Sequence, residues 1–192
     1  MCLYRYSFYY HKHFYANHFE SKIMPVNLEL KVKTDGHQFY INRLNEINAE
    51  FVHVLTQKDI YYKCKCGLLK LRIEDDTQTL IKYKRDEKSG SDRWSDYQLL
   101  TILSPDAETF FEDTLDIETV VEKTRSLYLY NNTRIHLDEV KNAGTFLELE
   151  TLVLGSPEEA RKRFNKIKNL LELNDLDELK KSYRDILTGK GQ

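Results

Sequence analysis

The stretch Val26-Asn27-Leu28-Glu29-Leu30-Lys31-Val32-Lys33 alternates strictly between apolar and polar residues. Successive side chains of an extended strand point to opposite faces, so this period of two places the apolar residues on one face and the polar residues on the other. The sequence therefore predicts a β-strand over 26–33. One face of this strand is suited to burial, and the other carries Glu29, Lys31 and Lys33.

Further strand-like stretches follow along the chain, separated by short turns. We expect them at roughly 58–64, 68–74, 78–85, 96–103, 119–130, 133–140 and 145–154. Asn131-Asn132 joins two of them, and asparagine tolerates the positive φ of a tight hairpin turn. Because the turns are short, consecutive strands are predicted to pair antiparallel.

Four other segments carry the signals of helices. Tyr40, Leu44 and Ile47 recur at i, i+4 and i+7, which predicts an amphipathic helix of about three turns before Phe51. The other three helices are predicted to begin at the capping sequences Ser104-Pro105, Ser156-Pro157-Glu158-Glu159 and Asp175 to Glu178. Together with the strands, they predict one α+β domain over residues 25–189.

The composition excludes several classes of protein. The chain has 192 residues, with 29 Lys+Arg against 31 Asp+Glu and a formal net charge of −2. No overall positive field therefore draws it to nucleic acid polymers or to anionic membranes. No run approaches the roughly 20 apolar residues of a membrane-spanning helix. The three cysteines are too few for a disulfide scaffold, and Cys64-x-Cys66 lacks C-x-x-C spacing, so we expect reduced thiols in a cytoplasmic protein.

Residues 1–24 differ from the rest of the chain. They are rich in Tyr, Phe and His and show no periodic apolar pattern, and termini of this kind rarely pack against a domain. Met24-Pro25 then opens a segment of ordinary composition. We expect residues 1–24 to be a disordered leader or a mis-assigned start. A metal site at His11, His13 and His18 is the alternative.

The second face of the expected strands is unusually charged. A sheet face left in water normally carries a mixture of Thr, Ser, Gln, Lys and Glu. Here charged residues and one histidine recur at alternate positions: Glu29, Lys31, Lys33, Lys70, Arg72, Glu74, Lys82, Lys84, Lys123, Arg125, Arg134, His136, Asp138, Glu148 and Glu150. This pattern indicates that the second face has a chemical function.

About eight antiparallel strands suffice to close a barrel, and closure removes exposed strand edges. The charged face would then line the interior, where charges must be paired or bind ions. A polyphosphate with divalent cations meets both needs, because Lys and Arg bind phosphate oxygens while carboxylates bind Mg²⁺ or Mn²⁺. The alternative is a solvated sheet whose Lys and Glu form only cross-strand ion pairs. Composition alone favours that alternative.

Motifs along the chain favour the barrel instead. Asn27-Leu28-Glu29-Leu30-Lys31 resembles the E-x-E-x-K signature of the CYTH superfamily, named for class IV adenylyl cyclases and thiamine triphosphatases. Further stretches that resemble the family follow in order: Lys58-Asp59-Ile60-Tyr61-Tyr62, Gly67–Arg72, Ser95-Asp96-Tyr97, Val121–Tyr128, Thr133–Asp138, Gly144–Glu150 and Ser182-Tyr183. The resemblance covers residue 27 to about residue 187 and is greater to the class IV cyclase branch.

The resemblance implies an eight-stranded antiparallel β-barrel with flanking helices, the triphosphate tunnel, which binds a triphosphate and a divalent metal, Mg²⁺ or Mn²⁺. It assigns metal coordination to Glu29, Glu148 and Glu150, with Asp138 beside them. It assigns phosphate binding to Lys31, Lys70, Arg72, Lys123, Arg125 and Arg134, and less directly to Lys33, Lys82 and Lys84. Lys31 is also a candidate catalytic acid–base group. Of its two roles, we prefer the phosphate contact. For His136 we prefer a structural hydrogen-bonding role over that of a general base.

Two positions depart from the family pattern. Asn27 stands where the signature has its first Glu, and an amide oxygen can bind a metal but adds no negative charge. Leu68 stands where relatives often carry Arg, which removes one phosphate contact.

By resemblance, the chain is expected to be a metal-dependent enzyme acting on a triphosphate. Class IV adenylyl cyclase activity, from ATP to cyclic AMP and pyrophosphate, is the leading expectation. An inorganic triphosphatase or another triphosphate phosphohydrolase is the alternative, and Asn27 motivates a third, a non-catalytic polyphosphate- or nucleotide-binding module. The expected partner is ATP or another triphosphate, with no nucleic acid polymer and no membrane. Monomer and homodimer both stay open.

Overall fold

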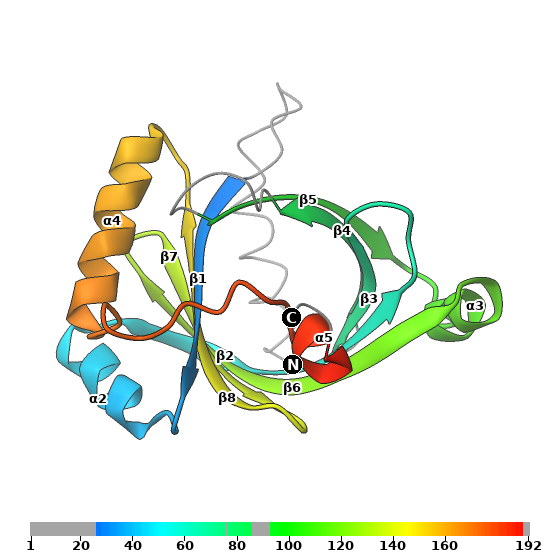
Figure 1. The fold of residues 1–192 in the computed structure, drawn as a ribbon, viewed down its shortest axis with the longest axis horizontal. Coiled ribbons are helices and arrows are strands. Elements are labelled where there is room, and N and C mark those ends of the chain that lie inside the picture. Colours follow the sequence, from blue (N-terminus) through cyan, green and yellow to red (C-terminus); the bar gives the residue numbers. More distant parts are fainter. Residues whose placement is uncertain (1–25, 76, 86–92, 190–192) are drawn as a thin grey trace, which may run out of the picture.

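The computed structural model describes residues 26–75, 77–85 and 93–189, so the expected leader at 1–24 lies outside the described residues. The strands are β1 (Val26–Thr34), β2 (Glu50–Tyr62), β3 (Leu68–Glu74), β4 (Thr77–Arg85), β5 (Arg93–Ile102), β6 (Ile117–Tyr130), β7 (Thr133–Val140) and β8 (Gly144–Leu152). The helices of this part are α2 (Gln38–Glu46), α3 (Ala107–Thr114), α4 (Pro157–Leu170) and α5 (Tyr183–Thr188) (Figure 1). The predicted α+β class is confirmed.

The eight strands form a closed antiparallel barrel in the order β1-β5-β4-β3-β2-β6-β7-β8. β1 closes the barrel, because it pairs with β5 on one side and with β8 on the other. At the β6–β7 hairpin, Asn131 and Asn132 have φ of 46° and 58°, in the left-handed region that tight hairpin turns require. The barrel predicted from the sequence is therefore confirmed, and each strand has an inner and an outer face.

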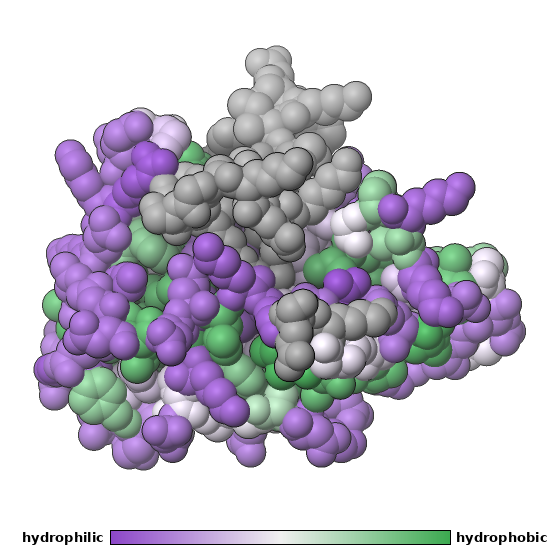
Figure 2. All heavy atoms as spheres, viewed as in Figure 1, coloured by the Kyte–Doolittle hydropathy of each residue, from purple (hydrophilic) through white to green (hydrophobic). Residues whose placement is uncertain are grey.

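The outer face of β1 packs beneath two helices. Leu28, Leu30 and Val32 are buried in an apolar cluster that also contains Leu44 of α2 and Ile167 of α4. Figure 1 shows both helices on this side of the barrel, and Figure 2 shows a mostly hydrophilic surface over α4. The apolar half of the β1 alternation thus faces the helices, which leaves its polar half for the barrel interior.

A second apolar cluster lies where α3 packs against the outside of β2 and β3. Ile60, Tyr62 and Leu71 are buried there with Ala107, and Phe111 packs against them. The two outer clusters thus bury apolar strand residues beneath the helices. Among the described residues, no helix is long and apolar enough to cross a membrane.

The C-terminal segment covers one end of the barrel interior. Tyr183 of α5 packs in a cluster with Tyr61 and Phe146, and its ring centroid lies 5.0 Å from that of Phe146. Before α5, the backbone N–H of Leu179 donates a hydrogen bond to the carbonyl of Lys31 at 2.7 Å. Figure 1 shows α5 within the outline of the barrel opening, so residues far apart in sequence meet at this end.

Three boundaries differ from the sequence prediction. α3 begins at Ala107 with Asp106 at its N-cap, and not at Ser104-Pro105. α2 ends at Glu46, and β2 begins at Glu50 rather than near residue 58. Asn48 adopts a φ of 55° after the helix, and the segment 50–57 then pairs with β6. At the other end, α5 begins only at Tyr183, because residues 178–179 run beside β1 and bond to it.

Candidate active site in the barrel interior

Cross-strand neighbours share a face of the sheet, so the strand register identifies the residues that face the barrel interior. Most of the charged positions singled out from the sequence lie on this one inner face. They are Glu29, Lys31, Lys33, Lys70, Arg72, Glu74, Lys123, Arg125, Arg134, His136, Asp138, Glu148 and Glu150. The same register adds a carboxylate that the sequence analysis assigned to no role, Asp59 of β2.

Two of the expected phosphate-binding residues lie on the outer face of the sheet. Lys82 pairs with Leu69, which packs against the outer cluster under α3, and Lys82 is exposed. Lys84 has the same parity in β4, and its side chain lies outside the described residues. Leu80 and Ile81 are adjacent apolar residues, so the β4 sequence does not distinguish inner from outer face. The register corrects the prediction that Lys82 and Lys84 share the inner face.

Asp59 lies at the centre of a cluster of cations. Its carboxylate accepts hydrogen bonds from Lys70 at 2.7 Å, from Arg72 at 2.7 and 2.8 Å, and from Lys123 at 3.1 Å. The residue is fully buried, and Lys70 and Lys123 are nearly so. We call these four residues the Asp59 cluster. With both lysines protonated, three cations and one carboxylate leave two positive charges uncompensated within it.

The charges of this cluster shift the pKa values of its members. Burial would raise the pKa of Asp59, but Arg72, Lys123 and Lys70 outweigh it and hold the pKa well below its usual range. Burial and the neighbouring Arg72 hold the pKa of Lys70 well below its usual range as well. An additional anion near Lys70 would stabilise its ammonium form, so the cluster is suited to a negatively charged ligand.

The carboxylate of Asp138 accepts hydrogen bonds from Arg125 and Tyr183. Arg125 donates two hydrogen bonds of 2.6 Å to the two oxygens of Asp138, and the hydroxyl of Tyr183 donates a third at 2.8 Å. Asp138 is fully buried, which makes these partners hard to exchange. These bonds hold Arg125 in place, and the metal role expected for Asp138 stays a prediction. The sequence could not reveal these bonds, because the direct pairing of Arg125 with Asp138 follows from the β6–β7 register.

Lys31 of the E-x-E-x-K stretch is held from three sides. Its ammonium forms an ion pair with Glu148 at 2.9 Å and donates to the carbonyl of Lys181 at 3.2 Å. It also lies 3.7 Å from the centroid of the Tyr183 ring, a cation–π distance. These contacts fix the charge of Lys31 at the covered end of the interior and agree better with a phosphate contact than with proton transfer.

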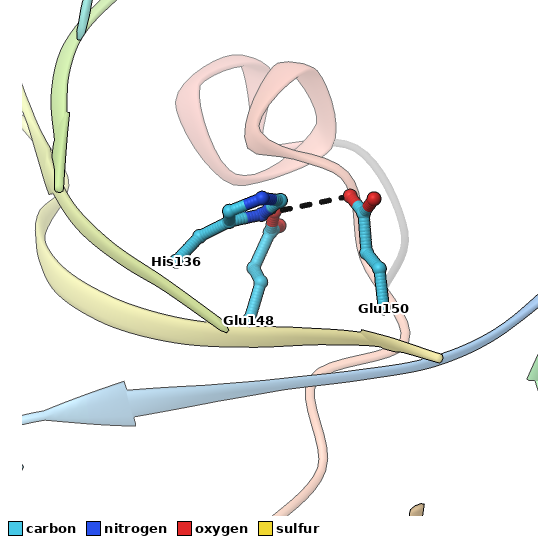
Figure 3. Close-up of side chains that lie close together, drawn as sticks. All are labelled: His136, Glu148 and Glu150. Carbon is cyan, nitrogen blue, oxygen red and sulfur yellow. Dashed lines mark ion pairs between the residues drawn. The ribbon is translucent and has the colours of Figure 1, made fainter. Parts of the chain in front are cut away.

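His136, Glu148 and Glu150 form a group with the composition of a metal site, and we call it the His136 triad. One ligand atom from each residue lies within 4.8 Å of the others, and Figure 3 shows the imidazole and both carboxylates turned toward one another. Nδ1 of His136 lies 3.6 Å from Glu150 and 3.9 Å from Glu148. Two carboxylates and an imidazole are ligands that divalent metals accept, so the triad fits a divalent ion.

Neighbouring cations keep the carboxylates of the triad ionised. Burial would raise the pKa of Glu150, but Arg134, 2.6 Å away, and His136 outweigh it and lower the pKa to about 2. For Glu148, Lys31 and Arg125 have the same effect against burial and hold the pKa well below its usual range. Both groups are thus in the form that binds cations at neutral pH.

Three more residues singled out from the sequence share the inner face with the triad. Glu29 pairs with Glu150 across β1 and β8, so it shares their face. Asn27 also lies on this face and is buried. Its side-chain oxygen has no hydrogen-bond partner among the described residues. Lys33 is exposed at the far end of β1. The interior therefore has an acidic region with candidate metal ligands and, beyond Arg125, the cationic Asp59 cluster.

Comparisons with known proteins relate this architecture to solved structures. A Pyrococcus horikoshii protein has a TM-score of 0.72 and 22% identity, with 83% of this chain and 98% of that chain covered. A candidate adenylate cyclase from Vibrio parahaemolyticus has a TM-score of 0.67 and 20% identity over 86% and 99% of the two chains. A candidate adenylyl cyclase from Hippeastrum, described as having a dominant triphosphatase activity, has a TM-score of 0.65 and 14% identity over 88% and 98%.

These likenesses at low identity show a shared fold. A search of curated protein sequences gave no significant match. The CYTH domain family matches residues 26–183, a range that contains all eight strands and every residue of the Asp59 cluster and the His136 triad. The closed barrel, its charged inner face and this match lead to one conclusion: the chain belongs to the CYTH domain family.

Proposed function

We propose that this protein is a metal-dependent enzyme that acts on a triphosphate inside the barrel, with conversion of ATP to cyclic AMP and pyrophosphate as its reaction. One observation carries the proposal: the Asp59 cluster and the His136 triad lie on the same inner face of a closed barrel. The first group suits phosphate oxygens, and the second suits a divalent ion.

The charges of the interior support a polyphosphate as the ligand. Arg72 and the two lysines of the Asp59 cluster exceed the charge of Asp59 by two. In the acidic region, by contrast, Lys31, Arg125 and Arg134 are matched by ion pairs with Asp138, Glu148 and Glu150. A triphosphate that carries a divalent ion suits this arrangement, because its phosphates offset the excess positive charge of the Asp59 cluster and the charge that the ion brings to the carboxylates.

In the proposed reaction, the ribose 3′-hydroxyl gives up its proton to solvent and its oxygen attacks the α-phosphorus, while the bond to the oxygen that bridges to the β-phosphate breaks. Negative charge then grows on the departing pyrophosphate, where Arg72, Lys123 and Lys70 would stabilise it. A divalent ion held by Glu148 and Glu150 would supply further neutralisation of phosphoryl oxygens. Lys31, held by Glu148 and the carbonyl of Lys181, is proposed as a fixed phosphate contact.

Hydrolysis of inorganic triphosphate or another triphosphate is the second candidate. The observation that favours it is the relative from Hippeastrum with its dominant triphosphatase activity. In that reaction water attacks the terminal phosphorus, and the same cations stabilise the leaving group. We also propose a cytoplasmic location, with which the free, exposed Cys64 and Cys66 agree.

The test offers ATP and inorganic tripolyphosphate separately to the full-length protein with Mg²⁺ or Mn²⁺, and quantifies cyclic AMP, pyrophosphate and orthophosphate. Cyclic AMP with an equal amount of pyrophosphate is the expected result. Orthophosphate without cyclic AMP would identify the hydrolase instead. Binding of tripolyphosphate without any product would overturn the enzymatic proposal and favour the binding module.

Variants connect the activity to the residues. The double variant Glu148→Gln/Glu150→Gln is expected to lose metal-dependent turnover, because both amides are neutral and bind divalent ions weakly. Glu122→Gln is the matched control, since Glu122 pairs with Lys141 on the exposed outer surface. Arg72→Ala is expected to raise KM or lower kcat. Turnover of the double variant equal to that of the control would contradict the metal assignment.

A further inference from the structure

His136 has a buried nitrogen without a hydrogen-bond partner. The residue is 4% exposed, and its Nδ1 makes no hydrogen bond to any described group. Buried polar atoms are nearly always paired, so an exception indicates a missing partner. Figure 3 shows that the Nδ1 edge of the ring is turned toward Glu148 and Glu150.

A direct ion pair with the two carboxylates does not account for this nitrogen. The distances of 3.6 and 3.9 Å from Nδ1 to Glu150 and Glu148 exceed the range of N–H···O hydrogen bonds. The carboxylates also have closer partners. Glu148 pairs with Lys31 and Arg125 at 2.9 and 2.6 Å, and Glu150 pairs with Arg134 at 2.6 Å. Each carboxylate therefore has a closer cationic partner than His136.

The spacing of the triad is close to that of ligands around a single ion. The three ligand atoms lie within 4.8 Å of one another. Two ligands that are each about 2.1 Å from one metal lie at most about 4.2 Å apart. Side-chain shifts of about half an ångström would bring the triad to coordination distance. Nδ1 would then have the partner that it lacks.

We propose that Nδ1 of His136 is a ligand of the divalent metal, alongside Glu148 and Glu150, and that the site consequently prefers Mn²⁺ to Mg²⁺. The inference rests on the proposed metal-dependent function and specifies its metal site. Imidazole nitrogen suits transition metals, whereas Mg²⁺ takes oxygen ligands in strict octahedral geometry. The preference therefore follows from one residue, and its removal should reduce the preference.

The test measures the metal directly, without substrate. Full-length protein is freed of metal and loaded with one equivalent of Mn²⁺, and pulsed electron paramagnetic resonance detects coupling to the nitrogen of a coordinated imidazole. The wild type is expected to show this coupling, and His136→Gln is expected to lose it. Titration should show Mn²⁺ affinity falling by about tenfold or more in His136→Gln, with Mg²⁺ affinity changing much less.

Two further variants keep the test decisive. His37→Gln is the matched control, because His37 lies at the N-cap position of α2 and its ring contacts the carbonyl of Phe146 and no residue of the triad. Glu150→Gln removes a carboxylate ligand while every histidine stays, so it should also weaken the nitrogen signal, even if His136→Gln does not fold. Nitrogen coupling that persists in a folded His136→Gln protein, or its absence from the wild type, would overturn the inference.

Turnover of tripolyphosphate and ATP is measured on the same samples, with Mn²⁺ and with Mg²⁺. Turnover without nitrogen coupling would overturn only the ligand role of His136. Nitrogen coupling without turnover of either substrate would support the ligand role and contradict the proposed function.

Discussion

Replacement of Asp59 by Asn should strongly destabilise the fold. The change leaves Lys70, Arg72 and Lys123 inside the barrel without the carboxylate to which all three donate. Breaking a buried ion pair by removal of one partner costs about 3–5 kcal/mol. We expect the lower end, about 3 kcal/mol, because the Arg72 side chain is 21% exposed and buried lysines can release their protons.

Urea unfolding followed by circular dichroism measures this loss. For a slope of about 2 kcal/mol per molar urea, a loss of about 3 kcal/mol lowers the midpoint by about 1.5 M. Glu122→Gln makes the same chemical change in an exposed ion pair, and its midpoint should not shift measurably. A midpoint of Asp59→Asn equal to that of this control would refute the reasoning that Asp59 neutralises the three cations in the folded state.

The difference in the free energy of unfolding between wild type and Asp59→Asn should change with pH in a known direction. The pKa of Asp59 is lowered in the folded protein, so its contribution is present above the unfolded pKa of about 3.9 and disappears as pH falls through the folded value. The difference in unfolding free energy between wild type and Asp59→Asn should therefore narrow below about pH 4, where Asp59 begins to take up a proton. A difference that stays unchanged down to about pH 2 would contradict the assigned protonation state.

Two other substitutions test the packing that supports the site. Leu147→Ala removes a fully buried side chain of β8 and should lower the free energy of unfolding by about 2–5 kcal/mol in the same urea assay; a loss well below 1 kcal/mol would contradict the burial. Ser182→Ala removes the N-cap of α5, whose hydroxyl accepts from the N–H of Asp185, and should cost about 1 kcal/mol. Ser182→Thr, which keeps a hydroxyl that can cap the helix, is the control and should retain most of the stability.

Sequence patterns predicted the barrel because its strands obey simple alternation. In β1, apolar and polar residues alternate without exception, and the structure places Leu28, Leu30 and Val32 under the helices. The pattern is weaker in β4, where the adjacent Leu80 and Ile81 conceal the inner face, and the prediction for Lys82 was wrong there. Alternation thus identifies a face only where one side of the strand is uniformly apolar.

The partners of the charged residues could not be predicted in the same way. Asp59 lies within a stretch that resembles the family, yet its three cations come from β3 and β6, and only the register between strands brings them together. The same holds for Asp138, whose oxygens are taken by Arg125 from the neighbouring strand. Nor does the sequence show that Nδ1 of His136 is unpartnered, because that depends on distances to every surrounding group.

The closure of the barrel by β1 has a consequence for the order of events during synthesis. The first described strand must wait for both of its neighbours, β5 and β8, and Lys31 bonds to Lys181, 150 positions later in the chain. Such long-range contacts make folding slow. While the ribosome is still producing the second half, β1 has two open edges, and Glu29 and Lys31 provide charges of the kind that discourage edge-to-edge association. The residues proposed to bind metal and phosphate would then also protect the nascent chain from aggregation.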